Sequence, residues 1–260
     1  MTEFYIDGFS ALLGDAPAED FAPYVEARRL RRMETAAKNA LLCSCRALVQ
    51  AGVALQTPKD MGLSVAVGAG ALQSTCKFMD SILDDGDELS SPTAFAGSVH
   101  NSTGLTLSMA LHLNGPCVTT GQFDASFAGA LLTARQFLTH RLCSRVLVAA
   151  AEDINPVAAA YAPENPSLFK TVLRAPEKPF VRAAAAWVVS AEPTVNTRFA
   201  VEHFEFSRTA LPNRQEPCEA CTAAWAAVKS VRQLEAGKPF MFHDVFGGAD
   251  LGMEITPYAK

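Results

Sequence analysis

The chain has 260 residues, a formal net charge of −5, 49% hydrophobic residues and 19% charged residues. This composition supplies enough apolar material for a folded core and excludes a mainly disordered chain. The net negative charge argues against a general nucleic-acid binder and against an anchor on anionic membranes, because both need clustered lysine and arginine.

The first half of the chain alternates between short apolar runs and amphipathic stretches. The short runs predict strands at 4–9, 61–67, 117–120 and 146–150. Apolar residues at helical spacing predict helices at 27–51, 71–83, 101–113 and 124–142. Residues 11–24 and the stretch that starts at Ser91 and Pro92 are predicted to be irregular.

The second half continues the alternation with longer interruptions. Strands are predicted at 183–189, 199–206 and 251–255, and a helix at 221–234. Residues 155–180 and 208–220 are rich in proline or polar residues and are predicted to be loops. Strands that alternate with helices are typical of a sheet covered by helices, so the expected class is α/β.

Cysteines and apolar runs indicate the cellular setting. The seven cysteines are an odd number, and most lie in apolar runs, where a free thiol behaves as a small hydrophobe. The first ten residues contain Glu3 and Asp7 and no basic cluster, so no secretory signal is expected. The longest wholly apolar run, 183–189, is much shorter than the ~18 residues of a membrane span. We therefore predict a cytoplasmic protein without a membrane partner.

Residues 115–131 carry the strongest motif, Gly-Pro-Cys-Val-Thr-Thr-Gly-Gln-Phe-Asp-Ala-Ser-Phe-Ala-Gly-Ala-Leu. This segment resembles the nucleophile elbow of β-ketoacyl synthases, in which a Gly-Pro pair opens a strand that turns sharply into a buried helix of small residues. Other segments resemble the family in the same order. They are Arg31-Arg32-Met33 with the helix that follows, 61–65, 91–104, 183–189 and the glycine-rich loop 245–250.

The resemblance implies a thiolase-like fold, layered α/β/α, with a mixed and mostly parallel sheet. It implies one domain over 1–260, in which 1–190 corresponds to the N-terminal half of a synthase. Residues 191–260 would form a reduced C-terminal extension that ends in a glycine-rich loop and a strand. That extension is too short for a complete second half of a synthase.

The catalytic residues of the family have no counterpart here. The position of the nucleophilic cysteine falls on Asp124. A carboxylate is a weak nucleophile and cannot hold an acyl chain as a thioester, whereas aspartate is a good helix N-cap. Only His203 and His243 follow residue 140, and neither lies in a glycine-flanked loop of the family type. We therefore predict no catalytic residue and no cofactor. We also predict no metal site, because the Cys218 and Cys221 pair lacks further ligands.

The resemblance is to the short chain-length factors that pair with a ketosynthase, as in aryl-polyene synthesis. It implies a non-catalytic subunit that shapes a shared acyl tunnel, with a catalytic ketosynthase as heterodimer partner and acyl carrier protein as a transient partner. The interface and elbow residues implied are Cys117, Val118, Thr119, Thr120, Gln122 and Phe123. The tunnel residues implied are Leu72, Thr75, Phe78 and Met79, which as an alternative are ordinary core residues.

Two other functions stay open on the sequence. The first is a free-standing enzyme of the thiolase superfamily, acting on acyl thioesters with Asp124 or His100 as acid or base. The second is a homodimeric scaffold that only binds carrier protein.

Overall fold

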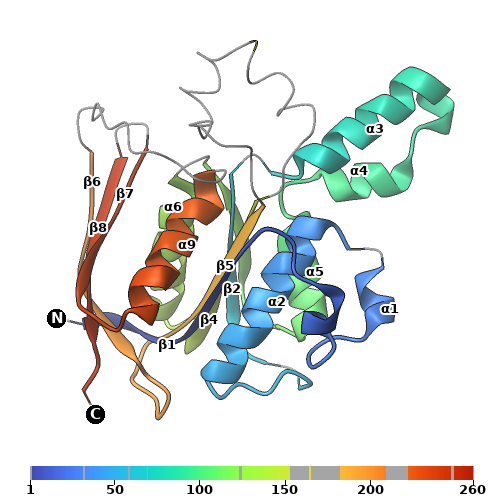
Figure 1. Cartoon of the computed structure of the whole chain (residues 1–260). Coiled ribbons are helices and arrows are strands. Elements are labelled where there is room, and N and C mark those ends of the chain that lie inside the picture. The colour runs from blue at the N-terminus through green and yellow to red at the C-terminus, as the bar shows by residue number, and fades with distance from the viewer. Residues whose placement is uncertain are drawn as a thin grey trace.

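The computed structural model describes residues 2–31, 33–57, 59–68, 70–122, 125–152, 164, 182–208, 222–246 and 249–259. These residues form one eight-stranded sheet with helices on both faces (Figure 1). The strands are β1 (Thr2–Leu13), β2 (Gly62–Val67), β3 (Cys117–Gly121), β4 (Arg145–Glu152), β5 (Ala183–Ser190), β6 (Phe199–Arg208), β7 (Phe240–Phe246) and β8 (Ala249–Pro257).

The strand order is β3-β2-β4-β5-β1-β6-β8-β7. β2 is parallel to β3 and to β4, and the five other pairings are antiparallel. The predicted α/β class and the mixed sheet are confirmed, but the expectation that most pairings are parallel is wrong. One reason is that β7 and β8 form a hairpin with Phe246 opposite Ala249, and so short a connection allows only antiparallel pairing.

Helices cover both faces of the sheet, so the α/β/α layering is confirmed. The helices are α1 (Ala27–Leu30), α2 (Thr35–Gln50), α3 (Leu72–Asp85), α4 (Pro92–Ser98), α5 (Ser102–Leu111), α6 (Ser126–Thr139) and α9 (Thr222–Glu235), with short 3-10 turns η1 (Ala18–Phe21) and η2 (Asp87–Leu89). α6 and α9 lie on one face, and α2 and α5 on the other.

Two hydrophobic cores therefore flank the sheet. The core under α6 and α9 contains an aromatic cluster of Phe127, Trp187 and Phe242, and the core under α2 and α5 is aliphatic. Strand β5 contributes to both, because Ala183 and Ala185 face one core while Ala184 and Ala186 face the other. Small side chains on both faces of this central strand let the two helical layers pack closely.

Four observed elements differ from the prediction. The helix expected at 27–51 is two helices, because the backbone of Glu34 is extended (ψ 152°) where its carboxylate accepts a hydrogen bond from Ser74 Oγ. Helix α4 was not predicted, although Ser91 caps it and Pro92 occupies its first turn, a pattern typical of helix starts. Strand β7 was not predicted either, since no strand was assigned to its residues and the last two, Val245 and Phe246, resembled the start of a family loop. Strand β1 extends to Leu13 into a segment predicted to be irregular.

Candidate functional site

The parallel strands β3, β2 and β4 end at the same edge of the sheet. The hydroxyl of Ser126, the first residue of α6, donates to the carbonyl oxygen of Val67 at 2.9 Å and accepts from the backbone N–H of Gln122 at 2.7 Å. The buried carboxylate of Glu152 accepts from the backbone N–H of Gly68 at 2.8 Å. These bonds join the three strand ends. Ligands of α/β proteins bind at this edge, so we call the turn between β3 and α6, with these strand ends, the elbow site.

The N-terminus of α6 is occupied by a carboxylate from the other end of the chain. Asp244 of β7 is buried, and its Oδ2 accepts a hydrogen bond of 3.2 Å from the backbone N–H of Ala128, in the first turn of α6. A negative charge at a helix N-terminus is stabilised by the unpaired N–H groups and the helix dipole. The same field would otherwise be free to stabilise a nucleophile. Phe123, one of the predicted interface and elbow residues, and Asp124, the nucleophile position, lie outside the described residues.

Asp244, Glu152 and Ser126 were not predicted as site residues. The burial pattern along β7 explains the position of Asp244. Buried Phe242 and Asp244 alternate with exposed Met241 and His243, as expected for a strand with one covered face. The alternation places the carboxylate of Asp244 on the side of α6.

His100 lies at the elbow site. A Cβ atom on Gly70 would approach the His100 ring to 2.7 Å, and one on Gly121, the last residue of β3, would approach it to 3.2 Å. Gly70 also has a positive φ of 73°, which glycine adopts without strain. The exposed imidazole is therefore packed against two glycines that follow or end parallel strands. Its predicted alternative role in a turn agrees with its position just before α5.

None of the cysteines whose pKa is shifted shows an activated thiol. Burial raises the pKa of Cys43 and of Cys45 to about 12. Burial also raises the pKa of Cys117 and of Cys143. A nucleophilic cysteine needs the opposite shift. Cys117 belongs to the edge strand β3 and not to the helix start.

Strand β3 is the edge of the described sheet on one side. All of its residues are exposed or half-buried, including Val118, which is 40% exposed. Thr119 faces Gly104 of α5, whereas Thr120 and Gln122 lie against Gly129 of α6. The structure thus brings the described residues of the predicted interface set, Cys117, Val118, Thr119, Thr120 and Gln122, together at this edge.

Helices α3 and α4 project from the body of the molecule as an arm (Figure 1). The rings of Phe78 and Phe95 pack at a centroid distance of 5.2 Å and join the two helices. The predicted tunnel residues Leu72, Thr75 and Phe78 are half-buried, and Met79 is 48% exposed. Ser74 is the one buried residue of α3, so the alternative that these four residues are ordinary core does not describe them. Their role in a tunnel stays a prediction.

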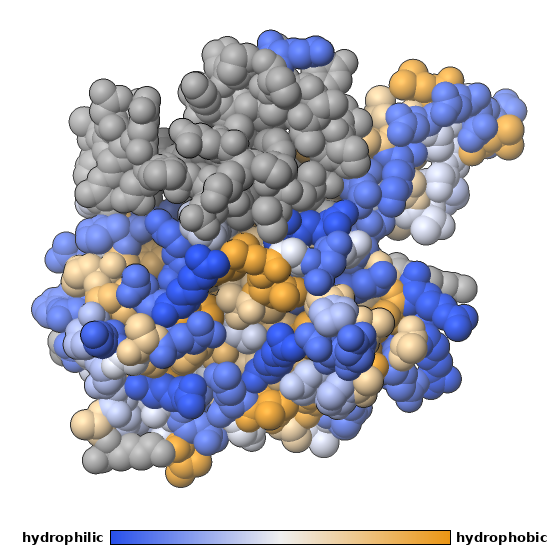
Figure 2. All heavy atoms as spheres, in the orientation of Figure 1, coloured by the Kyte–Doolittle hydropathy of each residue, from blue (hydrophilic) through white to orange (hydrophobic). Residues whose placement is uncertain are grey.

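Large apolar side chains are exposed on this side of the molecule. They include Met79, Leu83, Leu89, Phe95, Val99, Leu105, Met109 and Val118, on or next to α3, α4, α5 and β3. Figure 2 shows apolar atoms at the surface of the projecting arm. Exposed apolar patches of this kind mark surfaces that contact other proteins. We call the surface formed by these eight side chains the apolar flank.

Comparison with known proteins gives a family and a fold. The model of the beta-ketoacyl synthase N-terminal domain matches residues 14–236. No curated protein matches the sequence.

Solved structures of this fold include the ishigamide ketosynthase/chain length factor, with a TM-score of 0.73 at 15% identity and 100% of both chains covered. A beta-ketoacyl synthase from Burkholderia phymatum STM815 has a TM-score of 0.71 at 12% identity, again with 100% of both chains covered. The ketosynthase ApeO in complex with its chain length factor ApeC from Xenorhabdus doucetiae has a TM-score of 0.65 at 15% identity, with 97% of this chain and 99% of that chain covered. Among the described residues, no helix is long and apolar enough to cross a membrane.

Proposed function

The chain belongs to the β-ketoacyl synthase N-terminal domain family, and we propose that it is the non-catalytic, chain-length-factor partner of an active ketosynthase. The observation that carries this proposal is the edge strand β3 beside the apolar flank. Two solved structures of the same fold are described as containing a chain length factor, which supports the partner role.

Strand β3 supplies the pairing element in this proposal. The edge of a sheet presents unpaired N–H and C=O groups that another strand can bind. A ketosynthase strand added beside β3 would continue the sheet into the second subunit. Leu105 and Met109, one turn apart on α5 and 59% and 69% exposed, would be covered by the partner's helices. Association would thus bury apolar surface that the single chain leaves in water.

The elbow site supports a non-catalytic role. Asp124 cannot form the acyl thioester on which chain elongation depends. The carboxylate of Asp244 already occupies the N-terminus of α6, so a thiolate or oxyanion there would meet a negative charge. Catalysis would therefore take place at the elbow of the ketosynthase. Acyl carrier protein would bring the growing chain to that subunit.

We extend the proposal to chain-length control by α3. Leu72, Thr75, Phe78 and Met79 would line the shared tunnel, because α3 contributes little to the core of its own chain. One methylene of misfit in an apolar pocket costs about 1–3 kcal/mol, which is enough to decide when elongation stops. We propose an aryl polyene as the product, because the sequence resembles the chain-length factors of aryl-polyene synthesis.

The test is co-expression with a ketosynthase that has an intact cysteine elbow and both histidine loops. We expect a one-to-one complex by size-exclusion chromatography with light scattering. A homodimer that does not bind the ketosynthase would contradict the proposal and favour the carrier-protein scaffold. In the complex, Met79→Ala and Met79→Trp should change product length in opposite directions. The same two changes at Met241, a methionine of similar exposure on β7, should not.

The position of His100 favours a second candidate function. Its imidazole packs on Gly121 at the end of β3, where an acid or base would meet a substrate bound at the elbow site. A free-standing enzyme acting on acyl thioesters would then use His100. Turnover by the purified single chain, lost in His100→Ala and in Asp124→Ala, would support this candidate. No turnover without the ketosynthase would rule it out.

A further inference from the structure

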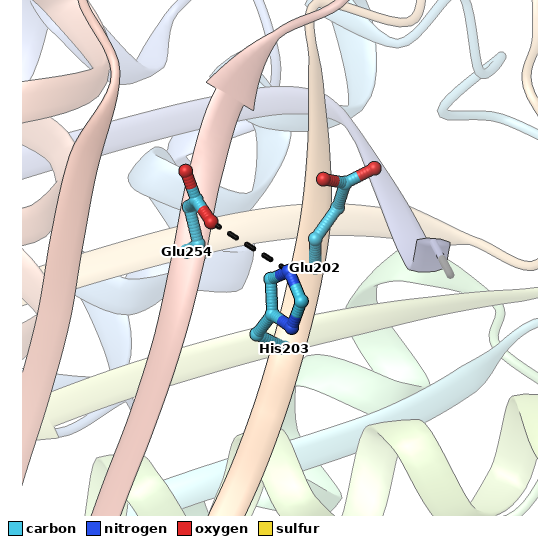
Figure 3. A group of neighbouring side chains, drawn as sticks. All are labelled: Glu202, His203 and Glu254. Atoms are coloured by element: carbon cyan, nitrogen blue, oxygen red, sulfur yellow. Dashed lines mark ion pairs between the residues drawn. The ribbon is translucent and has the colours of Figure 1, made fainter.

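Glu202, His203 and Glu254 gather on the face of β6 and β8 that points away from the α6–α9 core (Figure 3). Met253 and Ile255, the neighbours of Glu254 in β8, are buried in that core, so Glu254 points to the opposite face. Glu202 is its direct partner in the antiparallel register. Two like charges that face each other across a strand pair are destabilising unless a positive charge lies between them.

The described residues supply little of that positive charge. No described lysine or arginine forms an ion pair with Glu202 or Glu254, and the one ion pair at this position is that of His203 with Glu254. Thr2 Oγ1 donates to Glu202 Oε1 at 3.3 Å, which orients that carboxylate but adds no charge. The pair of carboxylates is therefore set up to bind a cation.

A bulge brings the histidine to the same place. The β6–β8 register shifts between Glu202 and Glu205, and His203 has a left-handed φ of 50°. In a regular strand His203 would point to the face opposite Glu202. Here its Nε2 lies 3.9 Å from Glu254 Oε2, and the imidazole and the glutamate point toward each other in Figure 3.

The three side chains form a donor set for a divalent transition metal. Each offers one ligand atom, and these two oxygens and one nitrogen all lie within 4.8 Å of one another. Zinc–oxygen and zinc–nitrogen bonds of about 2.0–2.2 Å hold tetrahedral ligands roughly 3.3–3.6 Å apart, a distance that small rotations of the glutamates can reach. Imidazole with carboxylate suits Zn²⁺ and its neighbours better than Ca²⁺ or Mg²⁺, which prefer oxygen alone.

We propose that Glu202, His203 and Glu254 form a binding site for a divalent transition metal of the Zn²⁺ type. The bound ion would neutralise the facing carboxylates and link β6 to β8, while solvent completes its coordination. Since the side chains of His203 and Glu254 are 66% and 42% exposed, the ion would have direct access. The sequence did not predict this site, because its ligands are about fifty residues apart and depend on strand register and a bulge for their proximity.

The experiment is a titration of the full chain with Co²⁺ and, separately, with Zn²⁺. Cys218→Ser and Cys221→Ser are introduced as a common background, so that the Cys-x-x-Cys pair cannot bind the probe. We expect one equivalent to bind, with a Co²⁺ absorption typical of nitrogen and oxygen ligands and a rise in Tm as metal is added. Binding that requires a cysteine, or no binding and no rise in Tm, would overturn the proposal.

Matched variants locate the ion. His203→Ala and Glu254→Gln should each weaken binding at least about tenfold, since even indirect partners of a metal contribute that much. His243→Ala removes a histidine from the neighbouring strand β7 and should leave affinity unchanged, because His243 is not one of the three grouped ligands. Since all three positions are on exposed or half-buried surface, the variants should fold, which circular dichroism checks. Equal affinity in all variants would overturn the site.

Discussion

Strands β5 and β3 belong to the same sheet and differ completely in burial. Every residue of β5 is buried, and its alanines are covered by helices on both faces. No residue of β3 is buried, and the surface around it exposes the large side chains of the apolar flank. The hydrophobic residues near β5 form the core of this chain. In the proposed complex, those near β3 would be covered by the ketosynthase.

The largest difference between the core around β5 and the exposed side is expected in the free energy of unfolding, on the substitution Phe127→Ala. Phe127 is fully buried and packs edge to face on Trp187 and Phe242 at 5.3 Å and 5.9 Å. Its loss should lower the free energy of unfolding by about 3–5 kcal/mol, measured by urea denaturation. Phe95→Ala on the arm removes a ring that is 56% exposed and should cost only about 0.5–1.5 kcal/mol. Equal losses would mean that the arm is part of the folding core.

The second effect concerns association rather than folding. Leu105→Asp with Met109→Asp places two charges on the exposed face of α5. The stability of the single chain should change by no more than about 0.5 kcal/mol per substitution, because both side chains are in water. The dissociation constant for the ketosynthase should rise at least about tenfold, because the charges would be buried at the interface. Titration calorimetry or analytical ultracentrifugation measures it.

Met241→Asp provides the control for this effect. Met241 is 55% exposed, and it lies on β7, at the other edge of the sheet. The Met241→Asp variant should leave the dissociation constant for the ketosynthase unchanged. If it weakens the complex as strongly as the α5 pair, then the interface lies at β7 and the role assigned to the apolar flank is wrong.

The difference between the two regions also explains which features of the fold could be predicted from the sequence. The strands near β5 were predicted closely, because continuous apolar runs such as 183–189 have one stable solution, a strand buried on both faces. Helix α3 was predicted as an element, but its exposure was not, since apolar patterning does not tell a core face from an exposed apolar face. The expectation that β3 lies at an interface came from the family resemblance and not from its apolar pattern.

The elbow site shows a second limit. The sequence predicted the strand, turn and helix, because Gly115-Pro116 and the small residues of α6 are local signals. It did not predict Asp244 on the N–H of Ala128, a contact between residues 116 positions apart that depends on β7 entering the same sheet. Long-range polar contacts of this kind depend on strand register, because a one-residue slip would turn each side chain to the opposite face of the sheet.

A smaller effect is expected at the helix that links the two regions, α6. Asp244→Ala removes the carboxylate that accepts from Ala128 N and should lower the free energy of unfolding by about 0.5–2 kcal/mol. Asp244→Asn keeps an oxygen acceptor and removes the charge, so it should cost less than the alanine variant. Chemical denaturation of both variants measures the difference. Equal losses in the two variants would mean that the charge, and not the hydrogen bond, stabilises the helix start.

The smallest effect is a difference in reactivity between the thiols of α2 and the thiol of α3 in the arm. Burial raises the pKa of Cys43 and Cys45 from 9.0 to about 12, so both thiols stay protonated and shielded in the folded chain at pH 8. Cys76, half-buried on α3, should therefore react with iodoacetamide faster than Cys43 and Cys45, as peptide mass spectrometry would show. Because the folded pKa is raised, the stability contributed by the protonated thiols is complete below pH 9 and is lost as the pH rises from 9 toward 12. Labelling of Cys43 and Cys45 should accelerate over that range together with unfolding. Equal labelling of Cys43 and Cys76 in the native chain at pH 8 would show that α2 opens as readily as the arm, and the contrast in burial between the two regions would then not be a contrast in stability.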